Sequence, residues 1–160
     1  MLNKNLVSQR KSQSGFTLIE IMIAVVIVAI IAAIAVPSYQ SQVARGKLAE
    51  CASFAYQLAS VQEQYYTANQ TFAGSITAAS GLNASGTSEN GYCTAALTTV
   101  GGTCDPDDAS ERCVGFTLSV TFNNVPDSFI QCETLTLDNR GQKGVTTSSG
   151  TAGTVTECWR

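Results

Sequence analysis

The most uneven feature of the sequence is a run of apolar residues close to the start of the chain. It extends from Phe16 to Val36, 21 residues in which only Thr17 and Glu20 are polar. As an α-helix this run would be about 31 Å long, which matches the hydrocarbon thickness of a bilayer. The pattern therefore predicts a membrane-spanning helix over residues 16–36.

The helical pattern resumes after Pro37. Proline lacks an N–H and its ring collides with the carbonyl four residues back, so Pro37 predicts a kink rather than the end of the helix. Beyond it, Arg45, Lys47, Glu50, Gln57 and Glu63 are expected to face water. Residues expected on the buried face recur at intervals of three and four: Ala44, Leu48, Cys51, Ala55, Leu58, Gln62 and Tyr65. We therefore expect an amphipathic second half over residues 37–69, which completes a kinked rod of about 80 Å.

The rest of the chain, residues 70–160, is expected to form a small head. Residues 70–112 are rich in Ala, Ser, Thr, Gly and Asn without periodicity, and we expect a long, cross-linked connecting loop there. The sheet is expected over residues 113–147. Its predicted parts are a strand at 116–122 with strict alternation, a turn at 123–127, a strand at 129–137 with a bulge near 133–134, a hairpin turn at 138–141 and a short strand at 142–147. A helix followed by an antiparallel sheet on its apolar face is an α+β fold.

Charge distinguishes the first 15 residues from the rest of the chain. They hold Lys4, Arg10 and Lys11 and no acid, and because basic flanks stay in the cytoplasm, the head is expected outside the cell. The remaining chain has six Lys and Arg against twelve Asp and Glu, a formal charge of −6. That balance argues against a general affinity for nucleic acid or anionic lipid.

The six cysteines favour disulfides over a metal site. The chain has no histidine and no C-x-x-C pair, and an exported head lies in an oxidising compartment. Cys51 lies on the buried helix face and Cys93 opens the cross-linked part of the connection, so a Cys51–Cys93 bond would tie that loop to the helix. Cys104–Cys113 would then close a small loop, although other pairings remain open.

Glu20 is the anomaly of the apolar run. An acidic side chain in hydrocarbon costs about 2.5 to 3.5 kcal/mol on insertion scales and usually marks function. A cut between Gly15 and Phe16 would create an α-amine four residues before Glu20. The two groups would then pair within one chain or between neighbouring chains, and the second arrangement would make Glu20 a determinant of assembly.

The segment Gly15-Phe16-Thr17-Leu18-Ile19-Glu20 closely resembles the processing signature of type IV pilins and of type II secretion pseudopilins. Val36-Pro37-Ser38-Tyr39 matches the next landmark of the family. The residues 135–144 and the closing Cys158-Trp159 resemble the sheet and C-terminus of PilE-like minor pilins and related major pilins. The resemblance covers residues 15–69 and 113–160.

The resemblance implies cleavage after Gly15 and methylation of Phe16 by a prepilin peptidase, which leaves residues 1–15 as a leader. It implies a Cys132–Cys158 disulfide that closes the C-terminal loop, residues 148–160. The expected product is a structural subunit, held in the inner membrane and passed by an assembly platform into a filament with other pilin subunits. That surface filament would serve adhesion, twitching motility or DNA uptake. Glu20 would pair with a neighbour's terminus, and Pro37 would let the helix bend.

Other interpretations remain open. Ala33-Ile34-Ala35 resembles a signal-peptidase site, but a signal peptide has a shorter apolar region and gives no reason for Glu20. A plain membrane anchor and a type II secretion pseudopilin are the remaining alternatives for residues 16–36. The sequence shows no histidine base, no nucleophile motif and no phosphate-binding loop, so we expect no enzymatic activity.

Two ligands need consideration for the head. Asp105, Asp107, Asp108 and Glu111 suggest Ca²⁺, although their spacing lacks the glycine of an EF-hand, so we expect a solvated acidic loop without a cofactor. DNA is a second ligand, for a specialised DNA-binding minor pilin. The basic residues that would contact it are Arg112, Arg140, Lys143 and Arg160.

Overall fold

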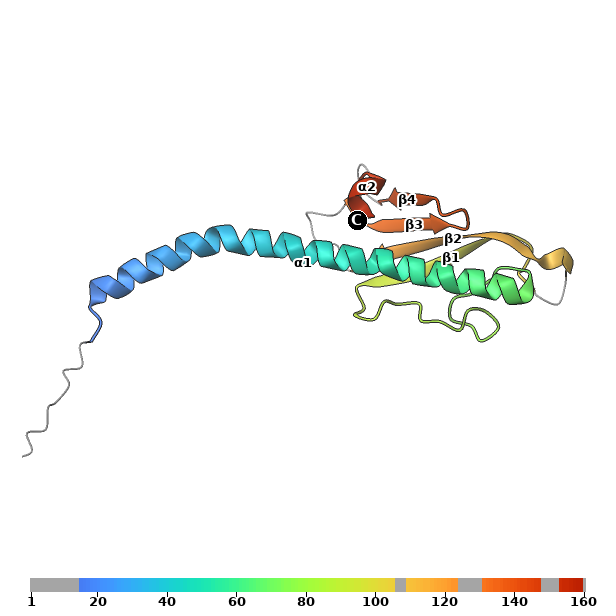
Figure 1. The fold of residues 1–160 in the computed structure, drawn as a ribbon, viewed down its shortest axis with the longest axis horizontal. Coiled ribbons are helices and arrows are strands. Elements are labelled where there is room, and N and C mark those ends of the chain that lie inside the picture. Colours follow the sequence, from blue (N-terminus) through green and yellow to red (C-terminus); the bar gives the residue numbers. More distant parts are fainter. Residues whose placement is uncertain (1–14, 106–108, 124–130, 148–152, 160) are drawn as a thin grey trace, which may run out of the picture. The chain divides into compact units, whose positions relative to one another are not determined.

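The computed structural model describes residues 15–105, 109–123, 131–147 and 153–159. The chain forms two compact units, residues 1–39 and residues 40–160, and the first helix runs through both. The elements in chain order are α1 (Leu18–Asn69), β1 (Cys93–Gly101), η1 (Ala109–Glu111), β2 (Cys113–Phe122), β3 (Thr134–Asp138), β4 (Lys143–Thr146) and α2 (Val155–Cys158), as Figure 1 shows. A long N-terminal helix followed by an antiparallel sheet confirms the predicted α+β fold.

In the first unit, α1 begins at Leu18 rather than at Phe16. Thr17 is the residue that starts the helix: its hydroxyl accepts a hydrogen bond from the N–H of Glu20 (3.3 Å), and its carbonyl accepts one from Ile21 (3.3 Å). A threonine in this position supplies an acceptor to the otherwise unpaired N–H groups of the first turn. The helix then continues through Pro37, as predicted.

The second unit has its own hydrophobic core between α1 and the sheet. The face of α1 that the sequence predicts is buried, except that Tyr65 is half-buried. The sheet faces it with every second residue of β2 and β3. The sheet residues in this core include Phe116, Leu118, Val120, Leu135 and Leu137. The four strands lie along the second half of α1 (Figure 1).

The sheet is antiparallel with the order β1-β2-β3-β4. Val120 in the middle of β2 lies opposite Ala95 of β1 and Leu135 of β3. The ladder between β1 and β2 is irregular between Val100 and Gly101, and Gly101 has φ +120°, a conformation that favours glycine. Val100 pairs with Gly115 and Gly101 with Cys113, so Val114 is the extra residue and the bulge lies in β2.

Two predictions about the strands are wrong. Residues 93–101 form β1 inside the segment that was expected to be an irregular loop. Their Ala and Thr side chains give a weak local signal, and pairing with β2 decides the conformation. The predicted strand at 129–137 starts only at Thr134, with Cys132 before it, so the bulge expected at 133–134 is not needed. Residues 129 and 130 lie outside the described part.

Candidate functional site

The predicted processing and assembly residues lie at the start of the first unit. Phe16 is 79% exposed, and Glu20 is exposed on the first turn of α1. Gly15 precedes them outside any helix or strand, whereas the remainder of the leader, residues 1–14, lies outside the described residues. Pro37 lies inside α1. A cut after Gly15 would therefore leave a short free segment, two residues long, before the helix begins at Leu18.

The first half of α1 presents an apolar surface on every side. In its most apolar 18-residue window no residue is buried, and among the described residues α1 is the helix long and apolar enough to cross a membrane. The exposed side chains include Ile21, Ile23, Val26, Ile30 and Ile34. Water does not favour a continuous apolar surface of this size, so the segment requires lipid or other apolar helices around it.

The three disulfides of the head connect Cys51 to Cys93, Cys104 to Cys113, and Cys132 to Cys158. These are the three pairs that the sequence analysis favours. Cys51–Cys93 ties the start of β1 to α1. Cys132–Cys158 joins the segment just before β3 to the end of α2, so the C-terminal segment is held against the sheet through a short helix.

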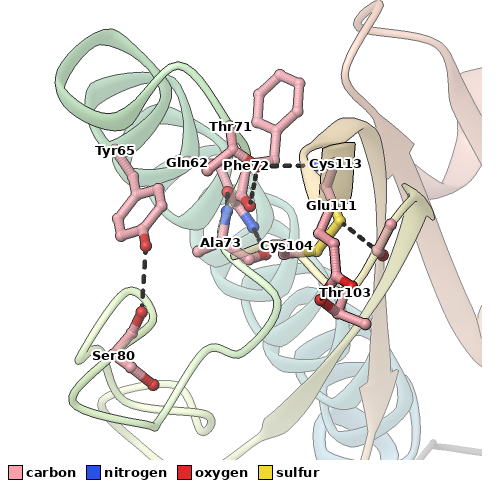
Figure 2. Close-up of a disulfide and its surroundings, with 11 residues drawn as sticks. Gln62, Tyr65, Thr71, Phe72, Ala73, Ser80, Thr103, Cys104, Glu111 and Cys113 are labelled. Atoms are coloured by element: carbon pink, nitrogen blue, oxygen red, sulfur yellow. Dashed lines mark hydrogen bonds between the residues drawn. A yellow bond between two sulfur atoms is a disulfide. The ribbon is translucent and has the colours of Figure 1, made fainter. Parts of the chain in front are cut away.

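The smallest disulfide loop, Cys104–Cys113, lies next to the C-terminal end of α1 (Figure 2). The hydroxyl of Thr71 accepts a hydrogen bond from the N–H of Cys113 (2.8 Å), and the N–H of Phe72 donates to the carbonyl of Cys113 (3.2 Å). Phe72 also contacts Phe116 edge to face, with ring centroids 5.0 Å apart. Segments before β1 and before β2 are thereby fixed to the same place in the core.

A cation and two aromatic rings gather where β4 meets α1. The amine of Lys143 lies 5.2 Å from the ring centre of Tyr56 and 5.6 Å from that of Trp159. The two rings contact each other edge to face at 5.5 Å, and Trp159 Nε1 donates a hydrogen bond to the carbonyl of Gly144 (2.9 Å). We call Tyr56, Lys143 and Trp159 the aromatic cluster. Tyr56 and Lys143 are exposed, so this cluster offers a positive charge and ring faces to a partner.

A second contact ties the loop before β1 to α1. The carboxylate of Glu50 accepts hydrogen bonds from Nδ2 of Asn90 (2.8 Å) and from its N–H (3.3 Å). Partial burial acts to raise the pKa of Glu50, but hydrogen bonds from Asn90 and Ser88 outweigh it, so the pKa of this carboxyl lies below its ordinary value. Nearby, the amine of Lys47 lies 4.9 Å from the ring centre of Tyr92. Glu50 and Lys47 were expected to face water and are instead half-buried.

The basic residues proposed for DNA have different surroundings. Arg140 is exposed in the turn between β3 and β4, and Lys143 belongs to the aromatic cluster. Arg112 is half-buried, and its Nε has no hydrogen-bond partner among the described residues. Arg160 lies outside the described part. The accessible candidates in the described part are therefore Arg140 and Lys143, which lie close together in the β3–β4 hairpin.

The acidic segment proposed for calcium is only partly described. Asp107 and Asp108 lie outside the described residues, and the carboxylate of Glu111 accepts a hydrogen bond from the hydroxyl of Thr103. Within the described ranges no group of three or more His, Cys, Asp or Glu side chains is placed to hold a metal ion.

Sequence reasoning missed the aromatic cluster, the Glu50–Asn90 contact and the role of Thr17. The first two join residues far apart in the chain, and no local pattern signals them. Thr17 had a local signal, because Thr-x-x-Glu over residues 17–20 is the spacing of a capping box.

Comparison with known proteins identifies the family to which the chain belongs. The prokaryotic N-terminal methylation motif matches residues 10–36, which places the chain in the class of proteins with a pilin-type N-terminus. The family described as "Type IV minor pilin ComP, DNA uptake sequence receptor" matches residues 37–136, which includes β1, β2 and most of β3. The chain belongs to this family of type IV pilins.

Individual relatives support the same class over a shorter range. The fimbrial protein EcpC of Eikenella corrodens is 43% identical over 58 residues, 36% of this chain and 38% of its own length. A fimbrial protein of Neisseria meningitidis is 42% identical over 67 residues, 42% and 39% of the two chains. The type IV major pilin protein PilE1 of Neisseria gonorrhoeae is 46% identical over 54 residues, 34% and 33%. The chain thus spans less than two fifths of the length of each of these relatives.

Proposed function

We propose that this chain is a minor subunit of a type IV pilus, with a structural rather than an enzymatic role. It is held in the inner membrane by the first half of α1, cut after Gly15 and methylated at Phe16 by a prepilin peptidase, and moved by an assembly platform into a filament on the cell surface. The observation that carries this proposal is the fully exposed apolar half of α1 joined to a head with its own core. Membership in a pilin family favours a pilus over a type II secretion filament.

The assembly mechanism rests on Glu20. The Thr17 hydroxyl accepts a hydrogen bond from the N–H of Glu20, so this backbone donor is satisfied within the chain. The carboxylate remains a negative charge beside apolar side chains, and transfer of such a charge out of water is costly unless a cation pairs with it. The α-amine of a cleaved Phe16, on the same or a neighbouring subunit, supplies that cation. Helix packing in the filament then gains both dispersion energy and charge neutralisation.

The test measures how much of this chain enters sheared surface filaments relative to the membrane fraction. Glu20→Gln keeps the shape and removes the charge, and we expect it to reduce incorporation strongly. Glu63→Gln, an exposed glutamate on the same helix, is the matched control and should leave incorporation unchanged. Thr17→Ala removes the hydroxyl that accepts a hydrogen bond from the Glu20 N–H, so it weakens the start of α1 while the negative charge of Glu20 is kept. Normal incorporation of the Glu20→Gln chain would refute the mechanism.

Processing has its own test. The N-terminal peptide of the chain from filaments should begin at Phe16 and carry a methyl group on its amine. A mature chain that begins at Met1 or at Val36 would contradict the proposal, since those termini correspond to a plain anchor and to signal-peptidase cleavage after Ala35.

We also infer that the head binds DNA during uptake, because the matched family is described as a DNA uptake sequence receptor. The net acidic charge argues against general affinity, so contact must be local. Arg140 and the aromatic cluster offer it: two exposed cations, Arg140 and Lys143, for phosphates, beside the exposed ring of Tyr56.

The binding test is a titration of the full chain in detergent with duplex DNA from its own species and with unrelated duplex DNA. The double variant Arg140→Ala, Lys143→Ala should bind more weakly, and the slope of its salt dependence should fall by about one unit for each phosphate that it no longer binds. Lys143→Arg keeps the positive charge and should retain DNA binding. Lys47→Ala is the control, because Lys47 also lies over a ring, that of Tyr92. Equal affinity of the double variant and the wild type would place the DNA contact elsewhere.

A further inference from the structure

Asn90-Gly91 is the one Asn-Gly pair in the sequence, and it is exposed. An asparagine before glycine is the arrangement most prone to deamidation, because no side chain on the next residue hinders attack by its backbone nitrogen. The pair lies in the loop before β1, directly beside the contact with Glu50. The surroundings of the pair therefore decide whether this reaction proceeds.

Both reacting groups are engaged elsewhere in the structure. Nδ2 of Asn90, which would leave as ammonia, donates to the Glu50 carboxylate (2.8 Å), and the N–H of Asn90 donates to the second oxygen (3.3 Å). The N–H of Gly91, whose nitrogen would attack, donates to the carbonyl of Ser88 (2.9 Å). The carbonyl of Gly91 accepts a hydrogen bond from the side chain of Asn123 (2.7 Å). The Asn90 side chain must leave Glu50 before it can turn toward the Gly91 nitrogen.

We propose that Asn90 is a site of spontaneous deamidation and that the carboxylate of Glu50 is the clamp that sets its rate. When the clamp opens, the Gly91 nitrogen loses its proton and forms a bond to Cγ of Asn90. The bond between Cγ and Nδ2 breaks, and ammonia leaves with the proton. Water then adds to one of the two carbonyls of the succinimide ring and gives aspartate or isoaspartate. The reaction needs no oxidant or cofactor.

The contact is open to solvent water, and the product would change the contact itself. An open hollow of about 310 Å³ lies at this contact, and its lining includes Glu50, Gln57, Ser88, Glu89 and Asn90. A carboxylate at position 90 would stand beside that of Glu50, where the amide now donates a hydrogen bond, and like charges at this distance repel. The loop would then separate from α1, while Cys51–Cys93 keeps β1 attached.

The first experiment monitors the full chain in detergent at fixed near-neutral pH over time. Peptide mass spectrometry measures the conversion of the side-chain amide to a carboxyl at Asn90, with Asn83 and Asn139 as internal references. Glu50→Ala should accelerate conversion at Asn90 about tenfold, the factor that corresponds to about 1.4 kcal/mol. Glu63→Ala is the matched control on the same helix. Equal conversion rates at Asn90 in Glu50→Ala and Glu63→Ala would show that Glu50 does not set the rate. If Asn90 converts no faster than Asn83 and Asn139 in either variant, Asn90 is not a deamidation site.

The second experiment tests the consequence without waiting for the reaction. Asn90→Asp mimics the product, and hydrogen exchange of the amides of Gly91, Tyr92 and Cys93 should be faster than in the wild type. Combination with Glu50→Gln removes one of the two charges and should restore slow exchange. Wild-type exchange in Asn90→Asp, or no rescue by Glu50→Gln, would overturn the proposed release of the loop.

Discussion

The side-chain amide of Gln62 forms two hydrogen bonds with the backbone of Ala73. Its Nε2 donates to the carbonyl of Ala73 (3.1 Å), and the N–H of Ala73 donates to its Oε1 (3.0 Å), with both residues fully buried. Figure 2 shows this pair next to the Cys104–Cys113 disulfide. A glutamine on the apolar face of α1 thus gives the chain that leaves the helix the hydrogen bonds that water would otherwise supply.

Removal of this side chain should be costly. Gln62→Ala leaves the buried N–H and carbonyl of Ala73 without these partners, and each unsatisfied group costs about 1 to 3 kcal/mol. We expect the free energy of unfolding to fall by about 2 to 4 kcal/mol in a urea titration. Gln64→Ala, two residues along on the exposed side of α1, should change it little. A small effect at Gln62 would mean that water replaces the lost bonds.

The C-terminal segment should depend on its disulfide. The Cys132–Cys158 bond spans 26 residues, and loss of such a link costs about 3 to 4 kcal/mol in the chain-entropy model. The Cys132→Ala, Cys158→Ala variant should therefore unfold at lower urea concentration than the wild type. The Cys104–Cys113 bond spans nine residues, and its removal should cost about 1 kcal/mol less. The reverse order would indicate that local packing, not chain entropy, dominates.

Trp159 should contribute to the stability of the fold through the hydrogen bond of its N–H as well as through its ring contact. Trp159→Phe keeps most of the ring contact with Tyr56 and loses the bond to the Gly144 carbonyl, which is worth about 0.5 to 1.5 kcal/mol. Trp159→Leu also loses the aromatic contact and should cost more. Both effects are measurable as shifts in the unfolding midpoint followed by circular dichroism. Equal stability of Trp159→Phe and the wild type would show that the N–H bond contributes nothing.

The Glu50 contact predicts a pH dependence. Its pKa is lower in the folded chain than the ordinary value of 4.5, so the ionised carboxylate stabilises the folded state. This contribution is complete above the ordinary pKa and is lost as pH falls through the lowered pKa. The difference in unfolding free energy between the wild type and Glu50→Gln should therefore be largest near neutral pH and shrink as the solution is acidified. A difference that stays constant with pH would show that the charge has no role.

The sequence predicts a large part of the fold, for reasons visible in particular residues. The end of α1 at Asn69 and its buried face follow from a 3.6-residue period that each turn repeats. The core of β2 follows from the strict alternation around Leu118. The alternation does not reveal that β2 begins at Cys113, because the extra residues pair with the end of β1.

The candidate site also has a part that the sequence predicts and a part that it does not. Gly15, Phe16 and Glu20 are recognisable because their function depends on a short contiguous segment. The aromatic cluster and the Glu50–Asn90 contact are not, because their residues are brought together from separate elements: 40 positions separate Glu50 from Asn90.

The sequence by itself determined the apolar first half of the helix, the one acidic residue of that half, Glu20, and the side of α1 that faces the head, since each depends on residues within a few turns. The tertiary structure decided that residues 93–101 form a strand, that β3 starts after Cys132, and that Trp159 lies against Tyr56 and Lys143. In those places the local preference is weak. Pairing with a distant strand, a disulfide or a ring contact then selects the conformation, because it supplies the free energy that the local sequence does not.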